Sequence, residues 1–181
     1  MKERKKELRR LIALRKASLP DATLKSLSMD ILGTLESHPV FRSSNTILLY
    51  HSMKDEVYTH TFIEKWSKRK HILLPVIQGD EPAIRSYRDS NGLTTGAYGI
   101  KEPTGAVFHD YARIDLAVVP GVAFDTSGSR LGRGKGYYDK LLPELTAYKI
   151  GICFPFQLLD EIPTEEFDIR MDEVIFNRKR Y

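Results

Sequence analysis

The sequence lacks several features that would assign it to a specialised class of protein. Cys153 is its only cysteine, which excludes a disulfide scaffold and metal sites built from several cysteines, and is typical of a reducing compartment. No apolar run approaches the roughly 18 residues that span a bilayer. We therefore expect a cytoplasmic protein that does not act in a membrane.

The composition is that of an ordinary folded protein. Hydrophobic residues make up 41% of the 181 positions and charged residues 29%, which excludes a disordered, collagen-like or coiled-coil chain. There is no internal repeat, low-complexity tract or long linker. The length predicts one domain over residues 1–181, large enough to bury a core without disulfides or metals.

Positive charge is concentrated at the N-terminus. The whole chain has a net charge of +4, but its first sixteen residues have +6 and the remainder −2. The segment can be a solvated helix face, part of an anion site or a targeting peptide, and Glu3 and Glu7 argue against the last. The net negative remainder argues against a nucleic-acid partner.

The hydrophobic pattern predicts an alternation of helices and strands. Leu8, Leu11 and Ile12 recur with helical spacing, whereas Pro75 and Gly79 are expected to end the second strand. The predicted helices cover residues 3–17, 20–35, 59–69 and 136–145, and the predicted strands cover 46–50, 71–76, 83–87, 115–119, 148–153 and 173–176. This order predicts a three-layer α/β domain with a mostly parallel central sheet and helices on both faces. Ligands of such sheets bind beyond the carboxyl ends of the strands, so the segment after Val119 is the first candidate for a ligand site.

Residues 120–139 combine glycine with positive charge. Their sequence is PGVAFDTSGSRLGRGKGYYD. Glycines let backbone N–H groups approach an anion, a following helix adds the positive end of its dipole, and basic side chains add charge. The pattern favours phosphate binding, and the alternative is a tight turn with solvated basic residues. Neither a Walker A loop nor G-x-G-x-x-G fits, because Ser129, Gly136 and Tyr137 stand where those motifs need other residues.

The same segment resembles the 5-formyltetrahydrofolate cyclo-ligase family, also called 5,10-methenyltetrahydrofolate synthetase. It matches every fixed position of the family's motif PGxxFDxxGxRLGxGxGYYD, in which the position of Arg133 is not always basic. Further matches lie in order along nearly all of the chain: Lys5-x-x-Leu8-Arg9, Ser52-Met53-x-Asp55-Glu56-Val57-x-Thr59, Glu102-Pro103, Gln157, Pro163, Asp168 and Asp172-Glu173-Val174.

The resemblance implies a reaction and a fold. Members of the family convert 5-formyltetrahydrofolate to 5,10-methenyltetrahydrofolate with ATP and Mg²⁺, and release ADP and phosphate. ATP phosphorylates the formyl oxygen, N10 attacks the activated carbon and phosphate leaves, so catalysis consists mainly of positioning and charge neutralisation. The implied fold is related to that of sugar-phosphate isomerases and CoA transferases. We expect ATP and the folate as the partners of a monomer.

The resemblance also implies the roles of individual residues. Lys135 and Arg130 are expected to neutralise phosphoryl charge, and Glu56 to pair with the 2-amino and adjacent N–H groups of the pterin; these three would carry catalysis. The expected ATP contacts are Lys5, Arg9, Arg130, Leu131, Gly132, Arg133, Gly134, Lys135, Gly136, Tyr137 and Tyr138. The expected folate contacts are His51, Glu56, Arg133, Gly134, Lys135, Gly136 and Tyr137. The expected magnesium ligands are Asp139 and Asp168, since Mg²⁺ often uses only one or two protein carboxylates.

Several of these residues have a purely structural alternative. The alternatives are a solvated helix face (Lys5, Arg9), packing (His51, Tyr137, Tyr138) and an isolated surface charge (Asp139, Asp168). Two rival functions also stay open: a sugar-phosphate isomerase or acyl-transfer enzyme of the same fold, and a nucleic-acid binder that uses the basic N-terminus.

Overall fold

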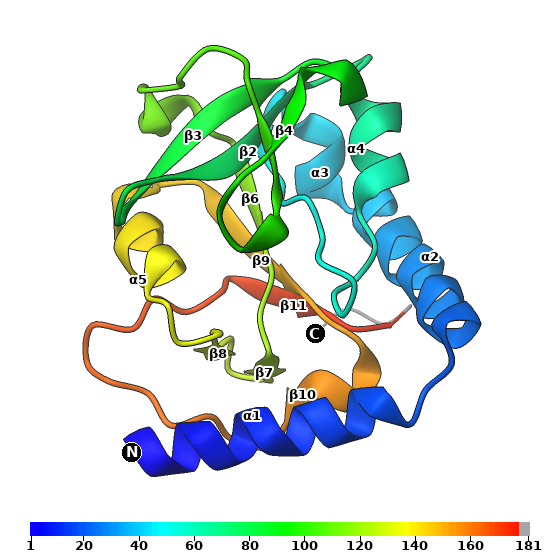
Figure 1. The fold of residues 1–181 in the computed structure, drawn as a ribbon, viewed down its shortest axis with the longest axis vertical. Helices are drawn as coiled ribbons and strands as arrows, with labels where there is room; N and C mark the ends of the chain where they lie inside the picture. The colour runs from blue at the N-terminus through cyan, green and yellow to red at the C-terminus, as the bar shows by residue number, and fades with distance from the viewer. Residues whose placement is uncertain (178–181) are drawn as a thin grey trace.

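The computed structural model describes residues 1–177 (Figure 1). Its α-helices are α1 (Lys2–Ala17), α2 (Asp21–Ser37), α3 (Pro39–Ser43), α4 (His60–Trp66) and α5 (Tyr137–Leu141). Its strands are β1 (Thr46–Leu48), β2 (His71–Gln78), β3 (Glu81–Tyr87), β4 (Leu93–Thr95), β5 (Lys101–Pro103), β6 (Leu116–Val119), β7 (Ala123–Asp125), β8 (Arg130–Leu131), β9 (Tyr148–Ile152), β10 (Leu158–Leu159) and β11 (Glu173–Ile175). No helix within this range is long and apolar enough to cross a membrane.

Six strands form the central sheet, in the order β11-β9-β6-β1-β2-β3. All neighbouring pairs are parallel except the hairpin of β2 and β3. The prediction of an α/β fold with a mostly parallel sheet is therefore confirmed. Two small sheets accompany it, β10-β7-β8 and β4-β5.

Apolar side chains project from both faces of the central sheet. Ile47 of β1 packs in a cluster with residues of α2, α3 and α4, including Leu35 and Phe41. The next residue, Leu48, points to the other face and packs with Leu141 and Leu142 at the end of α5. Because successive side chains of a strand point to opposite faces, a strand covered on both sides is apolar throughout, as β6 is.

Helix α1 covers the small sheet rather than the central one. Leu8 and Ile12 are buried against Ala123, Leu131 and Ile162, and Figure 1 shows α1 running along β7, β8 and β10. Its apolar stripe is thus explained by packing on the segment that follows β6. The basic side chains that flank this stripe are brought to the same segment.

The prediction that Pro75 ends the second strand is wrong, because β2 continues to Gln78. Pro75 pairs with Ile84 of β3, whose carbonyl accepts a hydrogen bond from the Phe108 N–H on the far side of β3. The polar backbone groups of Ile84 therefore face away from β2, and the pair needs no N–H from proline.

Residues 120–145 also differ in detail from the prediction. Part of the expected loop forms the hairpin of β7 and β8. Helix α5 ends at Leu141 and a 3₁₀ turn, Leu142–Glu144, follows. Pro143 has no N–H to donate to the carbonyl four residues earlier, so the α-helix cannot continue to residue 145.

Candidate active site

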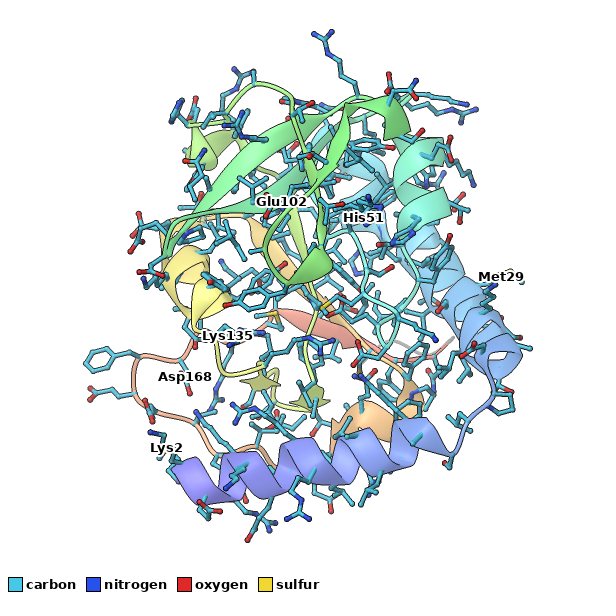
Figure 2. The ribbon with its side chains drawn as sticks, viewed as in Figure 1. Lys2, Met29, His51, Glu102, Lys135 and Asp168 are labelled. Carbon is cyan, nitrogen blue, oxygen red and sulfur yellow. The ribbon has the colours of Figure 1, made fainter. Side chains whose placement is uncertain are left out.

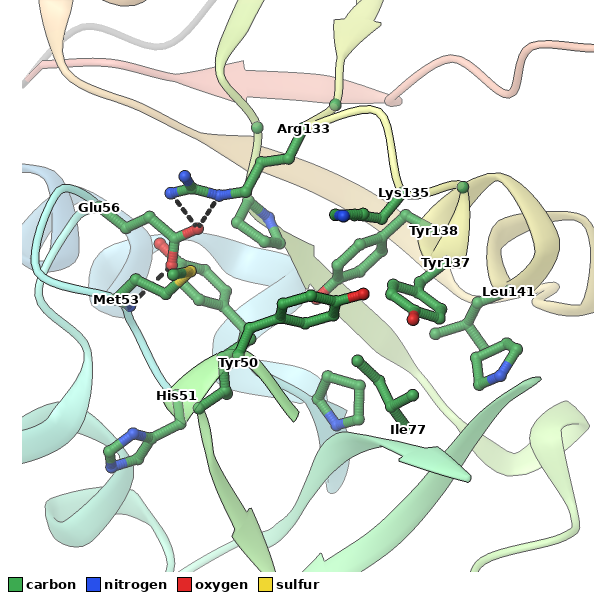
Figure 3. Close-up of a pocket in the computed structure, with 18 of the residues that line it drawn as sticks. Tyr50, His51, Met53, Glu56, Ile77, Arg133, Lys135, Tyr137, Tyr138 and Leu141 are labelled. Carbon is green, nitrogen blue, oxygen red and sulfur yellow. Dashed lines mark hydrogen bonds and ion pairs between the residues drawn. The ribbon is translucent and has the colours of Figure 1, made fainter. Parts of the chain in front are cut away.

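A cavity of about 260 Å³ opens where the chain leaves β1 and β6 (Figure 3). Tyr50 and His51 follow β1, and Pro120 follows β6, so the cavity lies at the carboxyl edge of the sheet where ligands of such folds bind. The predicted site residues that line it are His51, Glu56, Arg130, Gly132, Arg133, Gly134, Lys135, Gly136, Tyr137, Tyr138 and Asp139. The others, Lys5, Arg9, Leu131 and Asp168, are not among its lining residues.

Asp125 fixes the shape of the glycine-rich segment from inside the fold. Its Oδ1 accepts hydrogen bonds from the backbone N–H groups of Ser127 (3.0 Å) and Ser129 (2.9 Å), and its Oδ2 accepts one from Ile162 (2.9 Å). Burial works to raise the pKa of this carboxyl, but a hydrogen bond from the Ser127 hydroxyl (2.7 Å), together with those from the Ile162 and Ser129 N–H groups, outweighs burial and lowers it. Asp125 is therefore a structural anion within the motif.

Gly128 and Leu131 are also scaffold positions of the motif. Gly128 has φ +85°, and a Cβ there would overlap the Met171 carbonyl oxygen. Leu131 is 1% exposed and packs with Leu8 and Ile12 of α1. A contact of Leu131 with ATP can therefore be made only through its backbone.

Two basic residues of α1 reach the edge of this segment. Arg9 donates from Nε to the Gly132 carbonyl at 2.9 Å, and its guanidinium lies 3.5 Å from where a Cβ on Gly134 would be. Lys5 pairs with Asp168 at 3.5 Å. Arg9 thus contacts the predicted phosphate loop and Lys5 contacts an acid outside it, which disagrees with a purely solvated helix face.

Arg130 is a fixed cation under the cavity. Its side chain is 8% exposed and donates to the Pro120 carbonyl (3.2 Å) and to Asp139 Oδ1 (3.3 Å). The guanidinium lies over the Tyr138 ring, 5.1 Å from its centroid. Burial lowers the pKa of Arg130, and the charges of Asp139 and Asp168 oppose that shift. Burial also raises the pKa of the Tyr138 hydroxyl, and Tyr138 both lines the cavity and packs against the core cluster that contains Leu141.

Lys135 points into the cavity from the middle of the loop (Figure 3). Its Nζ lies 4.9 Å from the centroid of the Tyr98 ring, and no carboxylate of residues 1–177 forms an ion pair with it. The Tyr137 and Tyr98 rings are 6.4 Å apart. Lys135 is therefore a cation available for an anionic ligand, and Tyr98 is a wall residue that the sequence analysis did not identify.

Glu56 lies on the other side of the cavity and is engaged by Arg133 (Figure 3). Its Oε2 accepts from the Met53 N–H at 2.8 Å, and its Oε1 accepts from Arg133 Nε (3.3 Å) and a terminal guanidinium nitrogen (3.0 Å). That terminal nitrogen also donates to Asp55 at 2.6 Å. Burial works to lower the pKa of Arg133, but Asp55 and Glu56 outweigh it and raise the pKa.

His51 lies at the edge of the cavity and points away from its centre (Figure 3). Its ring stacks on His60 with centroids 3.7 Å apart. Burial, together with the charges of His60 and Lys101, lowers the pKa of His51 to about 4. The ring is therefore neutral at pH 7, which supports the alternative that His51 is a packing residue.

The two predicted metal ligands approach the phosphate loop from different segments. Asp139 lies in the first turn of α5 and pairs with Arg130, whereas Asp168 lies in the loop before β11, pairs with Lys5 and is labelled in Figure 2. Residues 1–177 contain no group of three or more His, Cys, Asp or Glu side chains that could hold a metal ion. Two carboxylates fit a magnesium ion that takes its other ligands from phosphates and water.

Two residues in or near the cavity belong to no motif in the sequence. Tyr50 is buried, lines the cavity and donates its hydroxyl to the Val57 carbonyl at 3.2 Å. Its place at the carboxyl end of the predicted strand 46–50 could have identified it. Lys16, whose Nζ pairs with Asp55 at 3.3 Å, carries no such signal, because only folding brings α1 to residues 53–56.

Comparisons with known proteins agree with this geometry. Residues 1–177 match the sequence profile described as the 5-formyltetrahydrofolate cyclo-ligase family. A probable 5-formyltetrahydrofolate cyclo-ligase of Schizosaccharomyces pombe is 30% identical, over 99% of this chain and 98% of that one. The 5-formyltetrahydrofolate cyclo-ligase of Escherichia coli K12 is 28% identical, over 91% of this chain and 96% of that one.

Solved structures give the same result. The NMR structure of Aquifex aeolicus 5,10-methenyltetrahydrofolate synthetase is 33% identical, with a TM-score of 0.88 over 97% of this chain and 91% of that one. The 5,10-methenyltetrahydrofolate synthetase of Mycoplasma pneumoniae is 27% identical, with a TM-score of 0.77 over 97% and 99% of the two chains. From its sequence, its fold and its cavity, this chain belongs to the 5-formyltetrahydrofolate cyclo-ligase family.

Proposed function

We propose that the protein converts 5-formyltetrahydrofolate to 5,10-methenyltetrahydrofolate and uses ATP, which leaves as ADP and phosphate. One observation carries the proposal beyond family membership. One cavity is lined by Lys135, a cation on a glycine-rich loop that forms no ion pair within residues 1–177, and by a carboxylate, Glu56, on the opposite wall. This arrangement suits a substrate that must present a formyl oxygen to a phosphoryl group while its pterin edge is held by an anion.

The chemistry requires positioning rather than a protein nucleophile. The formyl oxygen attacks the γ-phosphorus of ATP and ADP leaves; N10 then attacks the activated formyl carbon, and the C–O bond breaks with release of phosphate. Arg130 is held rigidly by Pro120 and Asp139, so it can stabilise developing phosphoryl charge without reorganising. Lys135 would meet the transferred group directly. Glu56 would fix the pterin by accepting from two N–H donors.

We propose Asp139 and Asp168 as the residues that hold Mg²⁺ on the nucleotide. When bound, the ion would supply charge neutralisation to the phosphates. The carboxylate chemistry of this pair supports the assignment. It is also supported by the charges of both acids, which act to raise the pKa of Arg130 against the effect of burial.

The remaining proposals concern the whole molecule. We propose that residues 1–181 act as one domain and as a monomer, with a fold related to that of sugar-phosphate isomerases and CoA transferases. We propose a cytoplasmic location, which the single cysteine supports because it suits a reducing compartment.

The direct experiment is to mix the protein with 5-formyltetrahydrofolate and MgATP and to follow the absorbance of the methenyl product. We expect ADP to form one-for-one with product and no turnover without ATP. Glu56→Gln should raise the KM for the folate far more than that for ATP, and Glu64→Gln on the exposed side of α4 is its control. Full turnover with β,γ-imido-ATP would contradict phosphorylation of the formyl oxygen, and equal weakening of both substrates would make Glu56 structural.

A further inference from the structure

The carboxylate proposed to anchor the pterin is already occupied in the ligand-free protein. Arg133 places two nitrogens on Glu56 Oε1, at 3.3 and 3.0 Å. A carboxylate oxygen has two acceptor positions, so Oε1 is saturated. Oε2 is held by the Met53 N–H at 2.8 Å. A two-donor pterin edge needs both oxygens, and it therefore cannot pair with Glu56 while Arg133 stays in place.

Arg133 is held in this position by a second acid outside the cavity. Asp55 accepts from the Arg133 guanidinium at 2.6 Å and, through its other oxygen, from Lys16 Nζ at 3.3 Å. Asp55 is not one of the residues that line the cavity. The Lys16 side chain is 11% exposed, so its ammonium group is kept near Asp55 by the packing of α1. Lys16, Asp55, Arg133 and Glu56 form a chain of alternating charge.

Of the two arginines in the loop, Arg133 is the more exposed. Its side chain is 39% exposed, against 8% for Arg130, which is tied to Pro120 and Asp139. It stands between Gly132 and Gly134, and Gly134 has φ +90°. A triphosphate at this loop carries several negative charges, and it can therefore compete with Asp55 and Glu56 for a side chain that starts from the same loop.

We propose that Asp55, fixed by Lys16, is a positioning residue that holds Arg133 on Glu56 until a nucleotide binds, so that ATP unmasks the pterin site. This inference rests on the proposed function. When Arg133 turns to the phosphates, Asp55 keeps Lys16 as its partner and Glu56 is left free for the pterin. By linkage, each ligand then strengthens binding of the other by the same factor.

The coupling has a defined thermodynamic form. A ligand that binds only the unmasked state loses affinity by the fraction of molecules in that state. Weakening the hold of Asp55 should therefore tighten folate binding in the absence of nucleotide and leave it unchanged when nucleotide is saturating. A variant that merely damaged the site would weaken binding in both conditions, so the direction of the change identifies the role.

The test is calorimetric titration of 5-formyltetrahydrofolate with and without saturating Mg²⁺–β,γ-imido-ATP. In the wild type we expect the analogue to tighten folate binding about tenfold, within the usual range of coupling between sites. Asp55→Asn should bind folate alone about tenfold more tightly than the wild type, and equally well with the analogue present. It should also bind the analogue alone more tightly. Asp110→Asn, at an exposed aspartate, should behave as the wild type.

Asp55→Ser removes the same carboxylate with a smaller side chain, and it should shift folate binding in the same direction, which keeps the test valid if Asp55→Asn fails to fold. Wild-type folate affinity that ignores the nucleotide, or weaker folate binding by both variants, would overturn the inference. If both ligands bind and turn over without coupling, only the inference fails. If the wild type binds neither ligand, the proposed function fails with it.

Discussion

Arg9 of α1 donates a hydrogen bond to the carbonyl of Gly132 at 2.9 Å and so ties the first helix of the chain to the glycine-rich loop. The two residues are separated by 123 positions, and the contact exists because Leu8 and Ile12 bury the same helix against Leu131. The apolar stripe thus sets the helix in place, and the basic residue beside it is brought to the loop that lines the cavity.

Arg9→Ala should raise the KM for ATP about tenfold and change the folate KM much less, because a hydrogen bond to a charged group contributes about 1.5–3 kcal/mol. Steady-state kinetics with each substrate varied in turn would measure this. Arg10→Ala is the matched control, since Arg10 is exposed on the same helix. An unchanged KM for ATP would show that Arg9 has only a structural role.

Lys135→Ala should lower kcat by about 10²–10³, the usual cost of removing one positioned donor to developing charge. The fold should survive because Lys135 is exposed and its ammonium group lies over the Tyr98 ring rather than in the core. Circular dichroism checks the fold, and Lys68→Ala, an exposed lysine, controls for the loss of charge. A near-normal kcat would mean that Arg130 and Arg133 neutralise the phosphoryl charge without it.

Asp139→Asn and Asp168→Asn should each shift the magnesium requirement upward, because a neutral amide oxygen is a poorer ligand for a hard cation. Activity is measured in a magnesium titration at fixed ATP. Asp160→Asn, an exposed aspartate, serves as the control. If both variants keep the wild-type titration curve, the two acids only hold Arg130 and Lys5.

Gly128→Ala should destabilise the fold by about 3 kcal/mol or more, from the strain of a positive φ and from overlap with the Met171 carbonyl. Gly79 also has a positive φ, +64°, but open space around its Cβ position. Gly79→Ala should therefore cost only about 1 kcal/mol. Urea unfolding of both variants separates the overlap from the strain, and equal losses would show that Met171 moves aside freely.

The pH dependence of stability should carry a contribution from His51. Its pKa falls from 6.5 to about 4 on folding, so the unfolded chain binds more protons between these values and stability is lost as pH falls from 6.5 to 4. His51→Phe should lose less stability than the wild type between pH 7 and pH 5 in urea unfolding. The exposed His109→Phe should keep the wild-type loss; the same loss in His51→Phe would refute the shift.

The order of helices and strands was predictable from the sequence because a buried face requires apolar residues at the repeat of a helix or of a strand. Strand β6 is apolar throughout because both faces of the central sheet are covered. Leu8 and Ile12 form an apolar stripe because they pack on the small sheet. The effect of Pro75 on β2 was not predictable, because it depends on which backbone groups of the partner strand face Pro75. Those groups are set by the register of β2 and β3.

The sequence by itself determined the family, the fold class and the glycine-rich loop, because these reside in local patterns and in one continuous motif. It could not separate the roles within that motif. Only tertiary structure decided that Asp125 and Leu131 are scaffold while Lys135 faces the cavity. The contact of Arg133 with Glu56 was likewise beyond the sequence, since it joins residues 77 positions apart. Such contacts depend on how distant segments pack together, and no local spacing records that.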